Sequence, residues 1–363
     1  MKSGIIMKRF AAAFKIILAV VVFMCSSSAF AKKRSKDNGG YLVITDYVKT
    51  DGKTDVADAI QKVIEANPNR TIFFPDGVYL LSHSIMTPAD PEKSVSLVLA
   101  NFAHLKAADT WSDGEAVVRL GAINPANNIK IPGSNYGFTG GIIDGSGVAN
   151  GISIDGGRET KIQNVSIKNT RIGVHIKYGA NSGSSDSDIS DVNIVGNNNS
   201  DAIGVLVEGY DNTFLNMRIA SVNIGVLIKS GGNILRNIHP LYVFGDKQNY
   251  ETSCGFVVQQ GNNWLNYCYS DQMGTGFRLA KGCRAQLTDC FCFWYSGKVP
   301  FQTVIECDGP LRAMVKGLNV GFNGNGKNFT LLKAEEGGDG ILSFLMLQDL
   351  PLAPTDASAL YIK

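Results

Sequence analysis

The chain lacks an excess of charge of either sign. Its 363 residues include 34 Lys and Arg and 32 Asp and Glu. Proteins that bind nucleic acid usually carry a clear basic surplus, because the negative phosphate backbone has to be neutralised. Four of the basic residues fall in the first 31 positions, which hold no acid, so 30 basic residues face 32 acidic ones in the remainder. We therefore expect no nucleic acid partner.

An apolar run long enough to cross a membrane is missing from the N-terminal segment. The segment Ile16–Met24 has nine apolar residues, whereas a membrane span needs about 20. Positive residues precede this run and Ala29-Phe30-Ala31 follows it, which is the order of a signal peptide. We expect residues 1–31 to be a signal peptide cleaved near Ala31, no membrane span, and export to the periplasm or the extracellular space.

Cysteines paired as Cys-x-x-Cys are absent as well, which argues against a zinc site. Six cysteines follow residue 31, and all lie between Cys254 and Cys307. An even number permits disulfides in an exported protein. Cys290 and Cys292, however, alternate with apolar neighbours as buried free thiols do. Both alternatives remain open, and we expect neither a metal nor a cofactor.

Helical spacing of apolar residues is absent from the centre of the chain, where a different pattern occurs six times. Each copy opens with Gly-hydrophobic-x-hydrophobic and continues with hydrophobic-x-Asn/Asp-hydrophobic. The opening glycines are 22, 31, 21, 30 and 21 residues apart: Gly151, Gly173, Gly204, Gly225, Gly255 and Gly276. Such a period is typical of a solenoid, and the alternation within each copy indicates short strands.

These features predict an all-β fold, a single-stranded right-handed parallel β-helix whose coils stack about 4.8 Å apart. The recurrent amide and acid side chains should stack at one turn and hydrogen-bond along the axis. They are Asn164, Asp191, Asn216, Asn237, Asn266 and Asp289. A β-sandwich of short strands is the alternative, but it gives no reason for Asn or Asp to recur at one place in the repeat.

A short N-terminal helix is expected ahead of the repeats. Val56, Ile60 and Val63 fall on one helical face, and Asp55 is suited to cap the helix. A helix in this position would cover the first coil, whose apolar surface and strand edges are otherwise exposed. We assign residues 41–350 to one β-helix domain.

The N-terminal half contains four short motifs: Asp46-Tyr47, Asp51-Gly52-Lys53-Thr54-Asp55, Phe74-Pro75-Asp76-Gly77-Val78-Tyr79 and Gly141-Ile142-Ile143-Asp144-Gly145-Ser146-Gly147. They resemble motifs of the pectate-lyase superfamily, as found in rhamnogalacturonase-like and epimerase-like β-helix proteins. The resemblance implies a right-handed parallel β-helix and a carbohydrate enzyme. We interpret Asp144 as structural, because Asp-Gly is turn chemistry.

The best-known catalytic motifs of this superfamily are absent. Polygalacturonases carry Asn-Thr-Asp, Asp-Asp, Gly-His-Gly and Arg-Ile-Lys, and pectate lyases carry calcium-binding aspartates, but the chain shows neither pattern. The candidates therefore come from geometry. One outward position per coil, after the Asn/Asp turn, should form an exterior column. This column comprises Ser166, Asn193, Arg218, His239, Cys268 and Phe291.

Two long turns, residues 196–203 and 240–254, follow strands of this column and should form a glycan groove beside it. The candidate catalytic residues are His239, Arg218, Asp201, Asp246 and Glu251. The candidate substrate-binding residues are Asn193, Tyr242 and Tyr250. In a lyase, His239 would act as the base and Arg218 would neutralise the sugar carboxylate. In a hydrolase, two of the three acids would act together. A solvated surface column is the alternative.

A second exterior column alternates in sign along the strands that open with glycine. It comprises Asp155, Lys177, Glu208 and Lys229. Surface ion pairs of this kind contribute about 0–1 kcal/mol each, and we interpret the column as structural. The same face, with His175 and Lys177, is the next candidate site if the His239 column proves inactive.

The sequence thus favours an exported carbohydrate-active protein, a polysaccharide lyase or a glycoside hydrolase that acts on a pectin-like or other acidic glycan. The expected partner is a polysaccharide or an oligosaccharide, and no oligomeric state is predicted. The alternative is a non-catalytic glycan-binding or surface-structural β-helix, because the catalytic motifs of the superfamily are missing.

Overall fold

The computed structural model divides into two units, Met1–Leu42 and Val43–Lys363. The residues that the structure describes are 40–112, 114–124, 137–179, 182–244, 249–295, 299–323, 329–348 and 360–362. The predicted signal peptide lies outside them. Within these ranges, no helix is both long enough and apolar enough to span a membrane.

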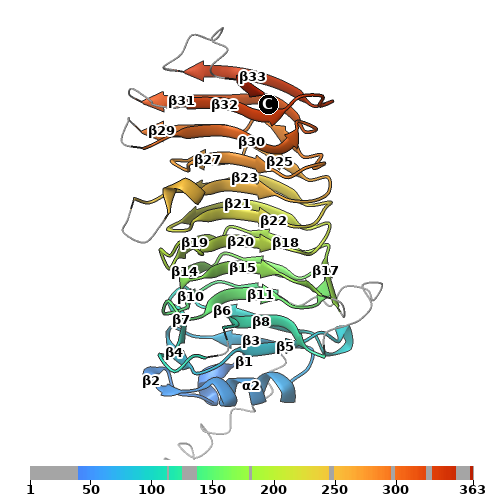
Figure 1. The fold of residues 1–363 in the computed structure, drawn as a ribbon. Helices are drawn as coiled ribbons and strands as arrows, with labels where there is room; N and C mark the ends of the chain where they lie inside the picture. The colour runs from blue at the N-terminus through green and yellow to red at the C-terminus, as the bar shows by residue number, and fades with distance from the viewer. Residues whose placement is uncertain are drawn as a thin grey trace, which may run out of the picture. The chain divides into compact units, whose positions relative to one another are not determined.

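The predicted N-terminal helix is present as α2 (Ala57–Ala66), at the end of the strand stack where the coils begin (Figure 1). Its buried side chains include Ile60, Val63 and Ile64. Oδ1 of Asp55 accepts a hydrogen bond from the backbone N–H of Ala57 at 3.1 Å. The helix therefore presents one apolar face to the first coil, as the spacing of its residues predicts.

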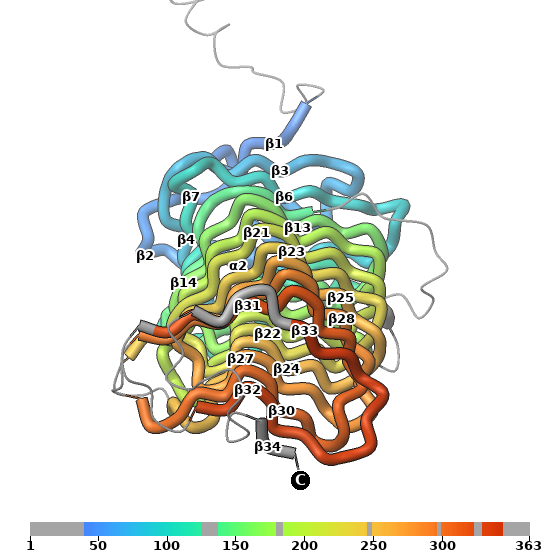
Figure 2. The backbone as a smooth tube through the Cα atoms, turned by 90° about the horizontal axis from the view of Figure 1, so that it is seen from above, coloured from blue at the N-terminus to red at the C-terminus, as the bar shows by residue number. Residues whose placement is uncertain are grey.

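The coils that follow build three faces of parallel strands, seen end-on in Figure 2. Face 1 contains β3 (Arg70–Phe74), β6 (Val95–Leu99), β9 (Gly137–Thr139), β13 (Lys161–Gln163), β18 (Asp188–Ser190), β25 (Trp264–Asn266) and β28 (Gln286–Thr288). Face 2 contains β2 (Asp51–Asp55), β4 (Gly77–Leu81), β7 (Ala103–Ala107), β10 (Ile142–Asp144), β14 (Ser166–Thr170), β19 (Asn193–Gly196), β26 (Tyr269–Asp271) and β29 (Phe291–Tyr295). Four strands run from face 1 around the corner into face 2: β21 (Thr213–Ala220), β23 (Ile234–Leu241), β31 (Met314–Asn323) and β33 (Ile341–Gln348).

Face 3 is a separate sheet that contains β5 (Ile85–Pro88), β8 (Ala116–Ile123), β11 (Asn150–Ile154), β15 (Ile172–Ile176), β20 (Ile203–Val207), β22 (Ile224–Ile228), β24 (Cys254–Val258), β27 (Thr275–Leu279), β30 (Gln302–Pro310), β32 (Phe329–Glu335) and β34 (Leu360–Ile362). A small sheet outside the three faces contains β12 (Gly157–Arg158), β16 (Tyr178–Gly179) and β17 (Ser182–Ser185). The fold is the predicted right-handed parallel β-helix, and its strands continue past residue 350, where the predicted domain ends.

The corner between faces 1 and 2 explains the recurrent Asn and Asp. Asn164, Asp191, Asn216, Asn237 and Asp289 all have φ between 51° and 56°, a left-handed conformation that Asn and Asp tolerate better than other non-glycine residues. Their side chains also stack as predicted: Asn216 donates to Asp191 at 3.1 Å, and Asn237 donates to Asn216 at 2.8 Å.

One coil departs from the predicted register at this corner. The left-handed position belongs to Tyr267 (φ 53°), not to Asn266. Asn266 instead ends β25 and pairs with Arg236 and Thr288 on face 1. The reason is burial, because Leu265 and Cys268 both point into the core and fix the two residues between them as the turn. The prediction that Cys268 lies in the exterior column is therefore wrong.

A second asparagine ladder, inside the helix between faces 3 and 1, was not predicted. Asn212, Asn233 and Asn263 are buried. Oδ1 of Asn233 accepts from both the backbone N–H and Nδ2 of Asn212, at 3.0 and 3.1 Å. Oδ1 of Asn263 accepts the same two bonds from Asn233, each at 3.1 Å. Each of these two side chains thus accepts the hydrogen bonds that the asparagine of the preceding coil donates at this turn.

The structure favours free thiols over disulfides, the two alternatives left open by the sequence. Cys254, Cys268, Cys283, Cys290 and Cys292 are buried free thiols, and Cys307 is a half-buried one. Burial raises the pKa of Cys254 to about 12, so its thiolate is not populated at neutral pH.

The opening glycines of the repeat are required by close approach between coils. A Cβ at Gly173 would lie 2.7 Å from the carbonyl oxygen of Gly204 and 2.6 Å from Cγ2 of Ile194. We expect Gly173→Ala to lower the free energy of unfolding by about 2–3 kcal/mol, because the next coil has to shift. Gly309→Ala is the control, since the atom it meets first is a lysine methylene, Cγ of Lys281, at 3.3 Å. Chemical denaturation measures both, and equal midpoints would contradict the explanation.

Candidate active site

The structure places three predicted site residues at paired positions on face 2. Asn193 pairs with Arg218, and Arg218 pairs with His239. The next member of the column is Tyr269, whose ring stacks on the His239 ring with centroids 4.1 Å apart and planes 19° apart. Phe291 follows and stacks on Tyr269 at 4.8 Å. The column therefore changes from polar to aromatic at His239.

Asp271 lies in the adjacent outward column, in the coil that follows His239, and was missed in the sequence. Its Oδ2 lies 3.4 Å from Nε2 of His239, and the two side chains are 16% and 25% exposed. Its Oδ1 is buried and has no hydrogen-bond partner among the described residues. Tyr269 and Asp271 flank the buried Ser270 in β26, so both point outward. A histidine, a tyrosine and a carboxylate thus converge on one exterior spot.

Tyr269 is held in its protonated form. Burial raises the pKa of its hydroxyl well above the ordinary range, and the negative charge of the neighbouring Asp271 carboxylate raises it further. A phenol that stays protonated at neutral pH can donate a proton to a reacting group.

A cleft of about 510 Å³ opens beside Asp271. It is lined by Leu241, Tyr242, Val243, Phe244, Asp271, Gln272 and Tyr295. Phe244 and Tyr295 are 58% and 60% exposed, which is unusual for large aromatic side chains. Exposed aromatic rings provide flat apolar surfaces, and the neighbouring carboxylate provides a polar group, which together suit a sugar ring.

The other predicted residues that the structure describes lie in the turns between faces 2 and 3. Tyr242 is 4% exposed and packs against Phe244 and Tyr250. The hydroxyl of Tyr250 donates to the carbonyl of Phe301 at 2.9 Å, and burial raises its pKa strongly. Both tyrosines thus brace the 242–253 turn, and the exposed aromatic residue of this turn is Phe244.

The hydrolase hypothesis requires two of the predicted acids in the cleft, but neither Asp201 nor Glu251 lines it. Glu251 is exposed in the short 3-10 helix η3 (Tyr250–Thr252), and Asp201 is exposed in the turn after β19. Asp246 lies outside the described residues. Among the described residues that line the cleft, the one acid is Asp271.

The second predicted column, on face 3, forms the expected ion pairs. Lys177 lies 3.2 Å from Asp155, and Lys229 lies 3.2 Å from Glu208. His175 adds a contact to Glu208 at 2.9 Å. Burial would raise the pKa of Asp155, but the hydrogen bonds from Ser153 and Arg119 outweigh it and hold the pKa below its ordinary value. The charges of this network are paired with one another, which fits its structural interpretation.

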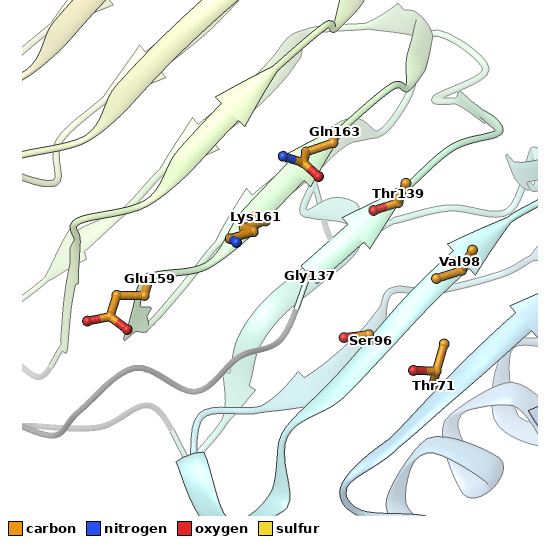
Figure 3. Close-up of a pocket in the computed structure, with 8 residues that line it drawn as sticks. All are labelled: Thr71, Ser96, Val98, Gly137, Thr139, Glu159, Lys161 and Gln163. Atoms are coloured by element: carbon orange, nitrogen blue, oxygen red, sulfur yellow. The ribbon is translucent and has the colours of Figure 1, made fainter. Parts of the chain in front are cut away.

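A smaller hollow of about 300 Å³ lies on face 1, over the first coils (Figure 3). Its lining side chains come from four neighbouring strands and include Thr71, Ser96, Thr139 and Gln163, with Glu159 and Lys161 at one side. None of the predicted site residues lines it. Within the described ranges, no three His, Cys, Asp or Glu side chains lie close enough together to hold a metal ion.

Comparisons with solved structures agree with this fold. An alginate lyase from Paenibacillus sp. str. FPU-7 has a TM-score of 0.57 and 16% identity, over 73% of this chain and 93% of that one. The A-module of Azotobacter vinelandii mannuronan C-5 epimerase AlgE6 has a TM-score of 0.51 and 13% identity, over 86% and 100%. A double mutant of the tailspike protein of E. coli bacteriophage HK620 has a TM-score of 0.56 and 10% identity, over 87% and 68%. At these identities the likeness concerns the fold alone.

No curated protein matches the chain. A family model does, and it covers residues 43–278, which include the helix α2, the corner ladder from Asn164 to Asn237 and the His239–Asp271 pair. The sequence motifs near Asp46 and Phe74, the three parallel faces and this match agree with one another. The chain belongs to the rhamnogalacturonase A/epimerase family of pectate lyase-like proteins.

Proposed function

We propose that the protein is a polysaccharide lyase that cleaves an acidic glycan by β-elimination at the site formed by Arg218, His239, Tyr269 and Asp271. The observation that carries the proposal is the stack of His239 on Tyr269 with Asp271 beside both rings. It provides a base, a proton donor and a positioning carboxylate within one coil spacing, and Arg218 occupies the adjacent position of the column.

Each group has a defined part in the elimination. Asp271 faces Nε2 of His239 and thereby keeps the imidazole proton on that nitrogen, which leaves Nδ1 free to accept a proton. The guanidinium of Arg218 pairs with the uronate carboxylate and lowers the cost of charge developing at C5. Asp271 acts through the imidazole and is a positioning residue.

The bonds change as follows in this proposal. His239 removes the C5 proton, the released electron pair forms the C4–C5 double bond, and the C4–O bond to the leaving sugar breaks. The Tyr269 hydroxyl protonates the leaving oxygen. The proton held by His239 then returns to the Tyr269 oxygen, so the site is restored and the glycan is split without water being consumed.

The arrangement favours elimination over two other reactions. Epimerisation at C5 removes a proton from one side of the ring and returns one to the other, whereas His239 and Tyr269 lie in one column on one face. Hydrolysis uses a pair of carboxylates about 5 Å or 6.5–9.5 Å apart, whereas Asp271 is the one acid among the described residues that line the cleft.

The test is a panel of uronate polysaccharides, including polygalacturonate and alginate, with a neutral glucan as the control. We expect ultraviolet absorbance from an unsaturated product together with new reducing ends on at least one uronate polymer, and neither on the glucan. Reducing ends without ultraviolet absorbance would indicate a hydrolase. An inverted C5 in the NMR spectrum without cleavage would indicate an epimerase. Retention of the polymer without any product would indicate a binding protein, and each of these three outcomes contradicts the proposal.

A further inference from the structure

Face 2 carries a second histidine–aspartate pair in the same relative position as the first. His104 lies in β7 and Asp144 in β10, the next strand, with Nε2 and Oδ2 3.5 Å apart. His239 and Asp271 are related in the same way, with the histidine in one outward column and the acid two residues further along in the next coil. The first pair faces Ile142 where the second faces Tyr269, so it lacks a proton donor at that position.

Two lysines flank the acid of this pair. Asp144 is in register with Lys106 of the preceding coil and with Lys168 of the following one. The carboxylate of Asp144 is already occupied by the backbone N–H of Ser146 at 2.9 Å and by Nδ2 of Asn169 at 3.0 Å. Among the described residues, neither lysine forms an ion pair of 4 Å or less. These two ammonium groups are therefore available to an external anion.

The histidine of this pair faces the acid and not the solvent. Nε2 of His104 is buried and lies 3.5 Å from Oδ2 of Asp144, so an external ligand does not reach it. Lys106 and Lys168 are therefore the groups of this region that an anion contacts, and an anion with several oxygens can contact both.

In its described strand residues, the part of face 2 between this pair and the cleft is free of negative charge in its two outward columns. The strands β7, β10, β14, β19, β21 and β23 follow one another on face 2, so His104 and His239 are separated by five coil spacings, about 24 Å. Arg218 lies one coil before His239. Between Asp144 and Asp271, the two outward columns contain no acid among the described strand residues. A polyanion laid along the axis therefore meets cations at both ends of this stretch.

We infer that Lys106 and Lys168, on either side of Asp144, form an anchoring site for a carboxylate or sulfate group of an acidic polysaccharide, remote from the cleft on the same face. The identity of the ligand rests on the proposed function, whereas the existence of the site rests on the geometry of the first coils. The site holds a long chain along face 2 while the cleft acts on another part of it. Short oligomers bound at the cleft do not reach it.

The experiment compares binding of a uronate polymer and of a short oligomer of the same sugar, on the catalytically inactive His239→Asn protein so that the ligand stays intact. We expect the added double variant K106Q/K168Q to bind the polymer about tenfold more weakly, the value for two exposed ionic contacts of about 0.7 kcal/mol each. Affinity for the short oligomer should not change. Lys316→Gln, an exposed strand lysine on face 1, is the matched control and should leave both affinities unchanged.

The outcomes separate this inference from the proposed function. Equal weakening for the polymer and the short oligomer, equal weakening by Lys316→Gln, or no weakening at all would each overturn the anchoring site. So would a protein that binds no acidic polymer. If the protein binds the polymer through Lys106 and Lys168 but never yields an unsaturated product, the result supports the anchoring site and contradicts the lyase proposal.

Discussion

Replacement of His239 by Asn should reduce turnover of the cognate acidic glycan by about 10²–10⁴-fold, the usual contribution of a positioned general base. The folded state should change little, because the side chain points outward and the change removes one ring stack of about 0.5–1.5 kcal/mol. Steady-state kinetics and thermal denaturation measure the two effects. A protein with unchanged kcat would show that His239 is not the base.

A matched control is available on the surface. His83 lies 3.3 Å from Asp58, and the two side chains are 42% and 84% exposed. His83→Asn removes a histidine from a similar pair away from the proposed site, and we expect full activity. Tyr269→Phe provides the complementary variant, since it keeps the ring stack on His239 and removes only the hydroxyl. We expect it to lower kcat with little change in KM, as for a group that acts only in the transition state.

Replacement of Asn233 by Ala should lower the free energy of unfolding by roughly 3–4 kcal/mol. The change leaves the backbone N–H and Nδ2 of Asn212 without the acceptor they share, and each unsatisfied buried donor costs about 1–3 kcal/mol. The residue touches no cleft residue, so kcat measured below the unfolding transition should persist. Chemical denaturation followed by circular dichroism measures the loss.

Asn216→Ala is the control for this variant. Asn216 belongs to the exterior ladder at the other corner, where its side-chain bonds are exposed. Its replacement costs about 1–2 kcal/mol, mainly because alanine is strained at φ 53°. Equal losses for the two variants would mean that the internal ladder contributes no more than the exterior one.

The fold follows from the sequence because its repeat has a physical cause at each position. The glycine recurs where neighbouring coils approach closely, as at Gly173, and the Asn or Asp recurs where the chain turns through a left-handed conformation, as at Asn216. The internal ladder has a comparable signal in the sequence, which the prediction overlooked. Asn212, Asn233 and Asn263 each follow the end of a face-3 strand by five residues.

The sequence predicted only part of the candidate site. Alternation placed Asn193, Arg218 and His239 in one column, and the register confirms that placement. The next coil has Tyr267 at the corner, so an assignment based on Asn266 moved the following strand by one residue and hid Tyr269. Asp271 comes from a neighbouring coil and a second column, and such a contact is set by register across coils, not by spacing along the chain.

The turn that carries Phe244 lies beside the proposed site and can vary in length without affecting the core that stabilises the protein. Twelve residues, 242–253, join β23 to β24, whereas three residues join β21 to β22 and β26 to β27. Yet Ile224, Cys254 and Thr275 remain in register across the three coils. Extra length at this edge is therefore accommodated without any change of pairing in the core. Evolution can lengthen, shorten or exchange such a turn to select a new sugar while the inherited scaffold stays intact.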